Sequence, residues 1–483
     1  MRRYWLLAAT LLAGCTVGPN YAPPPQAALP VPPAYSQAGA EGAAPAEWWK
    51  QFGDPELDRL VMLAASRNFD LEAAAARIAQ ARAQVAVARS SLLPTLDGTG
   101  GVNHVTFSKN AGLSSIASAL GGGGGGTTPG QGIALPGSGI TTFSLGLDAS
   151  WEVDLFGGTK RRVEGARARA EAAEWNARDL QVSLTAEVAS DYLQLRTLQS
   201  QIAIAQAELA RQRETLRLVA ARRQAGLVAE LPERQQALQL SNVAAQLPGL
   251  QAQAAAQVHA LGVLTASAPD ALAPELSVPR PLAAAPPQVP VGLPSELLRR
   301  RPDVRLAERQ LAAATADIGV AVADLYPKFN LMGMAELLST SLATLFSTNS
   351  IQTTISAAAN IPIFDGGARR ATVRNAQAVR DEALASYKQA VIGAVRDVED
   401  ALSAYTGEQR RNAELRRGVA DAEVAVRLAR AQFVTGLTDF TSVLDAQGAL
   451  LSNRNALAQS NATLLIDLSR LYKALGGGWT ETA

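Results

Sequence analysis

The chain has 483 residues, of which 48% are hydrophobic but only 5% aromatic, and alanine makes up much of the apolar share. This composition favours long, closely packed helices over a bulky globular core. The formal net charge of +1 gives no reason to expect a nucleic-acid partner, and His104 and His259, the only histidines, leave little from which to build a multi-histidine metal site or a catalytic triad. We therefore expect neither an enzyme nor a resident cofactor.

Residues 1–14 are typical of a signal peptide, with two arginines, an apolar run over 4–12 and a LeuAlaGlyCys sequence that ends at Cys15. This lipobox predicts cleavage before Cys15, with diacylglycerol on its sulfur and an acyl chain such as palmitate on its amine. The alternatives are an ordinary secretory signal and a membrane anchor, although the apolar run is only about half the ~20 residues of a spanning helix. Thr16 lacks the charge of the aspartate that typically retains lipoproteins in the inner membrane of enteric bacteria, which favours the outer membrane of a Gram-negative bacterium. Acylation of the only cysteine leaves no thiol for a disulfide or a metal.

The lipidated segment 15–53 is rich in proline, alanine and glycine up to residue 46, and we expect it to lie extended along the rest of the protein. Trp48, Trp49 and Phe52 are expected to pin its end. A first repeat follows over 54–264, and it opens with a helix predicted from about residue 55 to residue 92.

The sharpest strand signal lies at 142–155, where apolar and polar residues alternate without interruption. A half-buried sheet of a soluble protein would show the same alternation. In a lipidated protein, the charged residues on the polar face favour a membrane strand whose apolar side chains meet lipid. The lumen-facing residues are then Asp148, Glu152 and Asp154. The predicted partner strand is about 96–107, and six consecutive glycines in the loop 108–141 specify no fold.

A long helix is predicted over 159–225, roughly 100 Å at about 1.5 Å per residue. It ends at Gly226 and Leu227, and a shorter helix returns over about 231–262. The Pro/Ala-rich stretch 265–294 is expected to link two halves at mid-height of the helices, the equatorial level.

The same order of elements recurs in a second repeat at 295–478, because 300–329 aligns with 67–96 without a gap. Strands are predicted at about 328–338 and 351–364, followed by a long helix that ends at Gly436 and Leu437 and by a return helix. In each half the two shorter helices together match the long one in length. We expect them to stack end to end beside it.

The predicted fold class is therefore mixed α and transmembrane β, internally duplicated, with four membrane strands and long coiled helices in each chain. Four strands are too few to close a barrel, and unpaired strand edges cannot lie in lipid. The chain must then oligomerise, as a dimer or a trimer. A trimer would supply twelve strands for the barrel and wrap the helices into a tunnel in the periplasm.

Several motifs resemble the outer-membrane factor family, and specifically the NodT-like outer-membrane lipoproteins of RND-type efflux pumps. They are CysThrValGlyProAsnTyr at 15–21, TrpTrpLysGlnPheGlyAspPro at 48–55, LeuArgArgArgProAspVal at 298–304, AlaAspLeuTyrProLysPhe at 323–329, ThrGlyLeuThrAspPheThrSerValLeuAspAlaGln at 435–447 and TyrLysAlaLeuGlyGlyGlyTrp at 472–479. The resemblance implies a homotrimeric exit duct for small toxic compounds or drugs. It also implies two partners, a periplasmic adaptor (membrane fusion) protein and an inner-membrane RND transporter.

The same resemblance places a constriction at the periplasmic end, with Asp445 in one ring and Thr441 where the family often has an apolar second ring. Adaptor contact is expected at the two tips, through Gly226, Leu227, Gly436 and Leu437; plain helix termination is the alternative role. At the first tip the family's usual aspartate is replaced by Pro232, expected here at the first helical position, which leaves Glu230 or Glu233 to supply the charge.

Three other functions compete with the efflux duct. A structural periplasmic coiled-coil lipoprotein would need sustained heptads without a barrel, and the alternation at 142–155 argues against it. A lipid-anchored hydrolase would need a nucleophile with a base, and the sequence has no GlyXaaSerXaaGly elbow with a suitable histidine. An exit channel for type I protein secretion remains open, because the motifs that favour efflux do not touch the substrate.

Overall fold

The computed structural model describes residues 16–36, 45–106, 139–282 and 289–479, so that Cys15 and nearly all of the predicted loop 108–141 lie outside the described residues. Contacts divide the chain into two compact units. The strand unit comprises 1–21, 82–167 and 312–381, and the helical unit comprises 22–81, 168–311 and 382–483. Within the described ranges, no helix is both long enough and apolar enough to cross a membrane.

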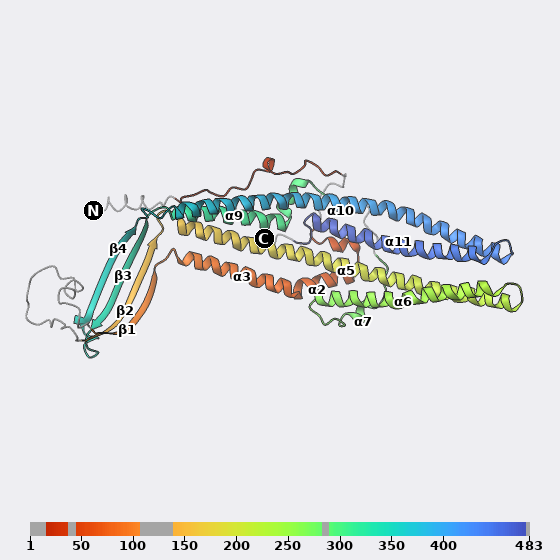
Figure 1. Cartoon of the computed structure of the whole chain (residues 1–483), viewed down its shortest axis with the longest axis horizontal. Helices are drawn as coiled ribbons and strands as arrows, with labels where there is room; N and C mark the ends of the chain where they lie inside the picture. Colours follow the sequence, from red (N-terminus) through yellow and green to blue (C-terminus); the bar gives the residue numbers. More distant parts are fainter. Residues whose placement is uncertain (1–15, 37–44, 107–138, 283–288, 480–483) are drawn as a thin grey trace, which may run out of the picture. The chain divides into compact units, whose positions relative to one another are not determined.

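One antiparallel sheet dominates the strand unit, with the strand order β1-β2-β3-β4 (Figure 1). Its strands are β1 (Thr95–Thr106), β2 (Gly139–Val153), β3 (Lys328–Ser339) and β4 (Ile351–Asn360). β4 ends earlier than the sequence suggested, because Pro362 has no N–H to donate to a ladder. β1 and β4 are the edge strands of this sheet.

The register gathers most of the large apolar residues of the four strands on one face, although Met332, Met334 and Leu338 of β3 lie on the other. Leu145 lies opposite Leu337, and Trp151 lies opposite Leu331. Directly opposed residues share a face, so the alternation continues across the sheet. Leu145, Trp151 and Leu331 are exposed in the single chain, and Ile355 of β4 is 92% exposed. The sheet therefore presents an apolar face that the described part of this chain leaves uncovered.

The predicted lumen-facing residues divide between the sheet and a helix cap. Asp148 lies in β2 on the polar face, where the hydroxyl of Thr99 donates to its Oδ2 at 3.0 Å, and Glu152 lies opposite Asn330. Asp154 was predicted to lie in the strand, but β2 ends at Val153. The Asp154 carboxylate accepts the backbone N–H of Lys160 at 2.9 Å and so caps the following helix.

Helices make up most of the described remainder, and each half contains a 67-residue helix followed by a 35-residue return helix. At about 1.5 Å per residue, each long helix measures roughly 100 Å. The α-helices are α2 (Pro55–Arg67), α3 (Phe69–Ser90), α5 (Gly158–Gln224), α6 (Glu230–Leu264), α7 (Ala273–Leu276), α8 (Leu297–Arg300), α9 (Pro302–Ala323), α10 (Ala368–Val434) and α11 (Phe440–Ala474). The short 3-10 helices are η1 (Gln26–Ala28), η2 (Trp48–Phe52), η3 (Pro294–Glu296) and η4 (Thr348–Ser350).

The expectation of one uninterrupted helix at the start of each half was wrong. The backbone is extended at Asn68, between α2 and α3, and again at Arg301, between α8 and α9. Arg301 is extended because it precedes Pro302, which disfavours the helical region for the residue before it. Asn68 acts as a helix cap, since its Oδ1 accepts the N–H of Asp70 at 2.9 Å. Both breaks fall at the same position of the repeat.

The end of the N-terminal segment and part of the link between the halves are packed into the helical unit. Trp48, Trp49 and Phe52 are buried in η2, as expected, and Trp48 stacks on Tyr472 of α11 with ring centroids 5.6 Å apart. The predicted linker 265–294 contains the short helix α7. Leu276 at the end of α7 is fully buried, so this part of the linker belongs to the helical core.

Candidate functional site

Two matching turns form the tips of the helical unit, one between α5 and α6 and one between α10 and α11 (Figure 1). Gly226 and Gly436 have φ angles of 70° and 76°, in the left-handed region that favours glycine. The N–H of Leu227 donates to Arg222 O at 2.9 Å, and that of Leu437 donates to Gln432 O at 2.8 Å. These contacts are the helix-ending Schellman motif, repeated in both halves. Leu227 is 67% exposed and Leu437 is 79% exposed, so each tip displays an apolar side chain.

Replacing Gly436 with alanine is expected to destabilise the tip by about 1 kcal/mol. The added Cβ would meet nothing within 4 Å, so the cost comes from the positive φ alone. Gly407→Ala is the matched control, because Gly407 lies inside α10 and its Cβ also meets open space. That control is expected to stabilise by up to about 1 kcal/mol through helix propensity. Denaturant unfolding of the purified protein measures both, and equal shifts of the same sign would contradict the assignment.

A small apolar cluster and one arginine fasten the two tips together. The cluster consists of Val219, Ala429, Phe440 and Val443. Arg222 of α5 donates to Val434 O at 3.0 Å, at the C-terminal end of α10, and its guanidinium lies 5.2 Å from the ring of Phe433. A cation at a helix C-terminus satisfies carbonyls that the helix itself leaves free. The first tip is thereby tied to the second.

Thr441 and Asp445 share an exposed face of α11. They are four residues apart, a spacing that puts side chains on one side of a helix. Val443 and Gln447 are buried on the other side. Asp439 is the N-cap residue of α11, although its side chain makes no capping hydrogen bond. The structure thus leaves both predicted aperture residues accessible.

At the first tip, between α5 and α6, Pro232 does not occupy the predicted position. α6 begins at Glu230, so Pro232 is its third residue and not its first. Proline is still tolerated there, because the N–H groups of the first turn have no partner within the helix. Both candidate charges are paired, Glu230 with Arg234 at 2.9 Å and Glu233 with Arg223.

Behind the tips lies a buried polar network that sequence reasoning missed. It joins Gln212 of α5, Gln236 of α6 and Gln447 of α11, each at most 5% exposed. Gln212 donates to Glu208 Oε1 at 2.6 Å and to Gln447 Oε1 at 3.3 Å, while Gln236 donates to the backbone oxygen of Gln212 at 3.1 Å. A glutamine in an alanine-rich helix is usually solvent-facing, so the sequence pattern does not distinguish these three from exposed ones.

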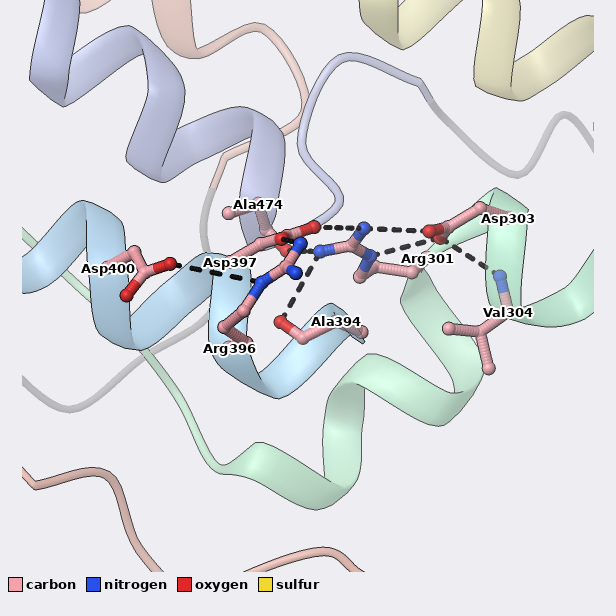
Figure 2. Close-up of polar contacts among 8 residues, drawn as sticks. All are labelled: Arg301, Asp303, Val304, Ala394, Arg396, Asp397, Asp400 and Ala474. Atoms are coloured by element: carbon pink, nitrogen blue, oxygen red, sulfur yellow. Dashed lines mark hydrogen bonds and ion pairs between the residues drawn. The ribbon is translucent and has the colours of Figure 1, made fainter. Parts of the chain in front are cut away.

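A second charged site surrounds Arg301, whose side chain is only 11% exposed (Figure 2). Arg301 Nε and Nη2 donate to the two carboxylate oxygens of Asp303 at 3.0 and 2.7 Å. Nη2 also donates to Asp397 of α10 at 3.0 Å. Its Nη1 donates to Ala474 O at 3.1 Å and to Ala394 O at 3.4 Å. One guanidinium therefore joins the start of α9, the middle of α10 and the end of α11.

A cavity of about 400 Å³ opens beside Arg301 and is lined by both acidic and basic residues. Burial raises the pKa of Asp179 in its wall, and the neighbouring Asp303 adds to this rise. Burial also acts to raise the pKa of Asp397, but the hydrogen bonds from Arg396 and Arg301 outweigh it and hold that pKa below the usual value. Among the described residues, no group of three or more His, Cys, Asp or Glu is placed to hold a metal ion.

Comparisons with known proteins agree with this architecture. The family model described as "Outer membrane efflux protein" matches residues 60–267 and 293–477. The chain is 33% identical over 482 residues to the pyoverdine export outer membrane protein OpmQ of Pseudomonas aeruginosa, covering 99% of this chain and 97% of that protein. It is 30% identical to nodulation protein T of Rhizobium leguminosarum bv. trifolii, covering 98% and 96%.

Among solved structures, the outer-membrane channel OprN superposes with a TM-score of 0.86 at 35% identity, covering 96% of this chain and all of that one. The resemblance identified from the sequence motifs is therefore confirmed over nearly the whole length. The chain belongs to the outer membrane efflux protein family, a family of outer-membrane efflux channels.

Proposed function

We propose that this chain is the exit duct of a tripartite efflux system, a passive pore and not an enzyme, and that it works as a homotrimer. The observation that carries the proposal is the four-stranded sheet with one apolar face and two edge strands, β1 and β4. An apolar face suits lipid, and free strand edges are not tolerated in lipid. Pairing β1 of one protomer with β4 of the next satisfies both edges, and three copies give twelve strands.

The polar face of the sheet would then line the lumen, with Asp148 and Glu152 directed to water. The long helices α5 and α10, with their return helices, would form the tunnel on the periplasmic side. The acylated Cys15 would add a lipid anchor in the outer membrane. The relatives support this assignment, since they include an outer membrane protein for pyoverdine export and the outer membrane proteins of a solvent and a toluene efflux pump in Pseudomonas.

The partners follow from the same reasoning. The two tips each present a glycine-leucine turn with an exposed leucine, which suits contact with the hairpin of a periplasmic adaptor. An inner-membrane RND transporter would select the compounds and supply the energy.

The gate is assigned to Asp445, with Thr441 on the same exposed face of α11. In a trimer three Asp445 carboxylates would meet near the axis, repel one another and attract cations. The contact of Arg222 with the end of α10 and the buried glutamine network hold the tip helices in place. Opening requires these helices to move apart when the adaptor docks.

Single-channel conductance of the purified protein in planar bilayers tests the proposal. The parent is expected to show small steps that divalent cations block, and Asp445→Ala is expected to show larger steps without that block. Asp421→Ala, which removes an exposed aspartate of α10, is the control and is expected to match the parent. Unchanged conductance in Asp445→Ala would move the gate elsewhere. No conductance from inserted oligomer would favour the structural coiled-coil lipoprotein.

A further inference from the structure

The residues that immediately follow Cys15 are bound to the turn after β2 and to the first turn of α5. The N–H of Val17 donates to Phe156 O at 3.1 Å, just after β2. Arg161, in the first turn of α5, donates from Nε to Val17 O at 3.1 Å and from Nη2 to Gly18 O at 3.3 Å. The same Nη2 donates to Asn20 Oδ1 at 2.6 Å. One arginine thus binds three acceptors of a segment far from it in the sequence.

Arg161 is an unusual residue to find buried, since it is only 3% exposed. Its charge is balanced by Glu164, at 2.8 Å from Nη1, and Glu164 is itself 42% exposed. Burying a guanidinium costs free energy unless its donors are satisfied. Here two main-chain oxygens and one side-chain oxygen of the N-terminal segment accept from the Nε and Nη2 donors of the buried guanidinium. The segment and the arginine therefore depend on each other.

Three glycines allow the segment to approach its neighbours more closely than residues with a Cβ could. Gly18 has a φ of +84°, and a Cβ there would lie 2.5 Å from the Cα of Gly319 in α9. A Cβ on Gly157 would lie 2.8 Å from Thr16, and one on Gly319 would lie 2.7 Å from the Cγ of Arg161. The contacts at Gly18 and Gly157 involve main-chain atoms and cannot be relieved by rotating a side chain, whereas a Cβ at Gly319 would displace the side chain of Arg161. The fit extends to Thr16, the residue next to the predicted lipid attachment site.

We propose that Arg161 is a positioning residue for the lipid anchor. With Gly18 and Gly319 it forms a seat for residues 16–20, so that the bound segment begins one residue after the predicted lipid attachment site. The seat lies where β2 leads into α5 and where α9 approaches β3, at one end of the strands. The partner of this site is the leaflet of the outer membrane that receives the lipid, and the proposal rests on the proposed function for lipidation and insertion.

A nitroxide label on Pro19→Cys tests the seat, because Pro19 is exposed and lies between two bound residues. The full-length protein is reconstituted in vesicles of phosphatidylethanolamine and phosphatidylglycerol, and the spectrum reports label mobility. The parent without Pro19→Cys should take up no label, since acylated Cys15 has no free thiol. We expect an immobilised label in the otherwise unchanged protein and in Arg162→Met, which removes the adjacent, exposed arginine.

Arg161→Met should release the segment, with the ratio of mobile to immobile label rising roughly tenfold or more, as the loss of charge-assisted hydrogen bonds requires. Gly319→Val should do the same without changing any charge, by displacing Arg161. Arg161→Lys keeps the charge but replaces the planar guanidinium with a single ammonium nitrogen. It should give an intermediate ratio of mobile to immobile label. A mobile label in the unchanged protein, or an immobile one in both Arg161→Met and Gly319→Val, would overturn the proposal.

The same samples separate this proposal from the proposed function. Mass spectrometry of the N-terminal peptide should show equal acylation in Arg161→Met and in the parent, while Arg161→Met inserts fewer conducting channels. Full channel insertion by Arg161→Met with a mobile label would overturn the role of the seat in placing the anchor. Absence of channels from the parent would count against the duct, and the label would still decide whether the seat exists.

Discussion

Replacing Arg301 with methionine is expected to lower the free energy of unfolding by about 3–5 kcal/mol, the range for breaking a buried ion pair from one side. Methionine keeps much of the aliphatic stem, so the loss comes from the guanidinium. Asp303 and Asp397 would lose their shared partner, and Ala474 O at the end of α11 would lose a donor (Figure 2). Three elements that are distant in sequence would separate more easily.

Arg396→Met is the matched control, because Arg396 contacts the same Asp397 at 2.8 Å but is 68% exposed. An exposed ion pair of this kind contributes about 0–1 kcal/mol. Denaturant unfolding in detergent, followed by far-UV circular dichroism, compares the two variants with the parent. Similar losses in both would mean that Arg301 acts as an ordinary surface ion pair.

The pH dependence of stability gives an independent readout of the same network. The pKa of Asp397 is lowered in the folded protein, where the hydrogen bonds from Arg396 and Arg301 overcome the opposing effect of burial. Its ionised form therefore stabilises the fold above the ordinary aspartate pKa of about 3.9, and this contribution is lost as the pH falls through the lowered value. Arg301→Met removes one of the two donors, so stability should fall less between neutral and acidic pH than it does in the parent.

Sequence patterns predicted the elements because their signals are local. The alternation at 142–155 has the period of a strand, and β2 is found there. Glycine followed by leucine predicted both tips, where Gly226 and Gly436 adopt the left-handed conformation. The family motifs predicted the efflux channel, which the comparisons confirm.

The alignment of the two halves predicted equivalent positions but not their chemistry. Asn68 and Arg301 occupy the same place in the repeat and both interrupt a helix. Asn68 Nδ2 donates to the oxygen of Leu264, the last residue of α6, at 3.0 Å, and Arg301 donates to that of Ala474, the last residue of α11. Each half thus ties its first break to the end of its return helix, with an amide in one half and a guanidinium in the other. Of the two residues, Arg301 also binds two carboxylates, those of Asp303 and Asp397.

Most of the contacts that sequence reasoning missed join residues far apart in the chain. Arg161 binds the segment after Cys15, and Gln212 of the first half meets Gln447 of the second. An arginine or a glutamine in a helical sequence carries no mark of burial, because its partners are decided by which helices pack together. Asp154 illustrates the same limit at short range, since strand and cap positions differ by a single residue at the end of β2.

Trp48→Ala is expected to cost about 3–5 kcal/mol, the range for truncating a large buried aromatic side chain to alanine. Trp48 is fully buried, stacks on Tyr472 of α11 and meets Phe52 edge-on with centroids 5.9 Å apart. The C-terminal tail also closes over it, because a Cβ at Gly477 would lie 3.1 Å from its ring. Removing the indole would leave a cavity that neither the tail nor α11 can fill without moving.

Trp48→Phe separates this packing from a general loss of the N-terminal segment. Phenylalanine keeps an aromatic ring for Tyr472 to stack on and leaves a smaller cavity, so its cost should be well below that of alanine. The indole Nε1 makes no hydrogen bond in the described structure, which means that phenylalanine sacrifices no polar contact. Limited proteolysis should cut the extended segment before Trp48 faster in Trp48→Ala than in Trp48→Phe. Equal cutting rates would show that Trp49 and Phe52 pin the segment without Trp48, and the anchor would then be the whole of η2 and not its central tryptophan.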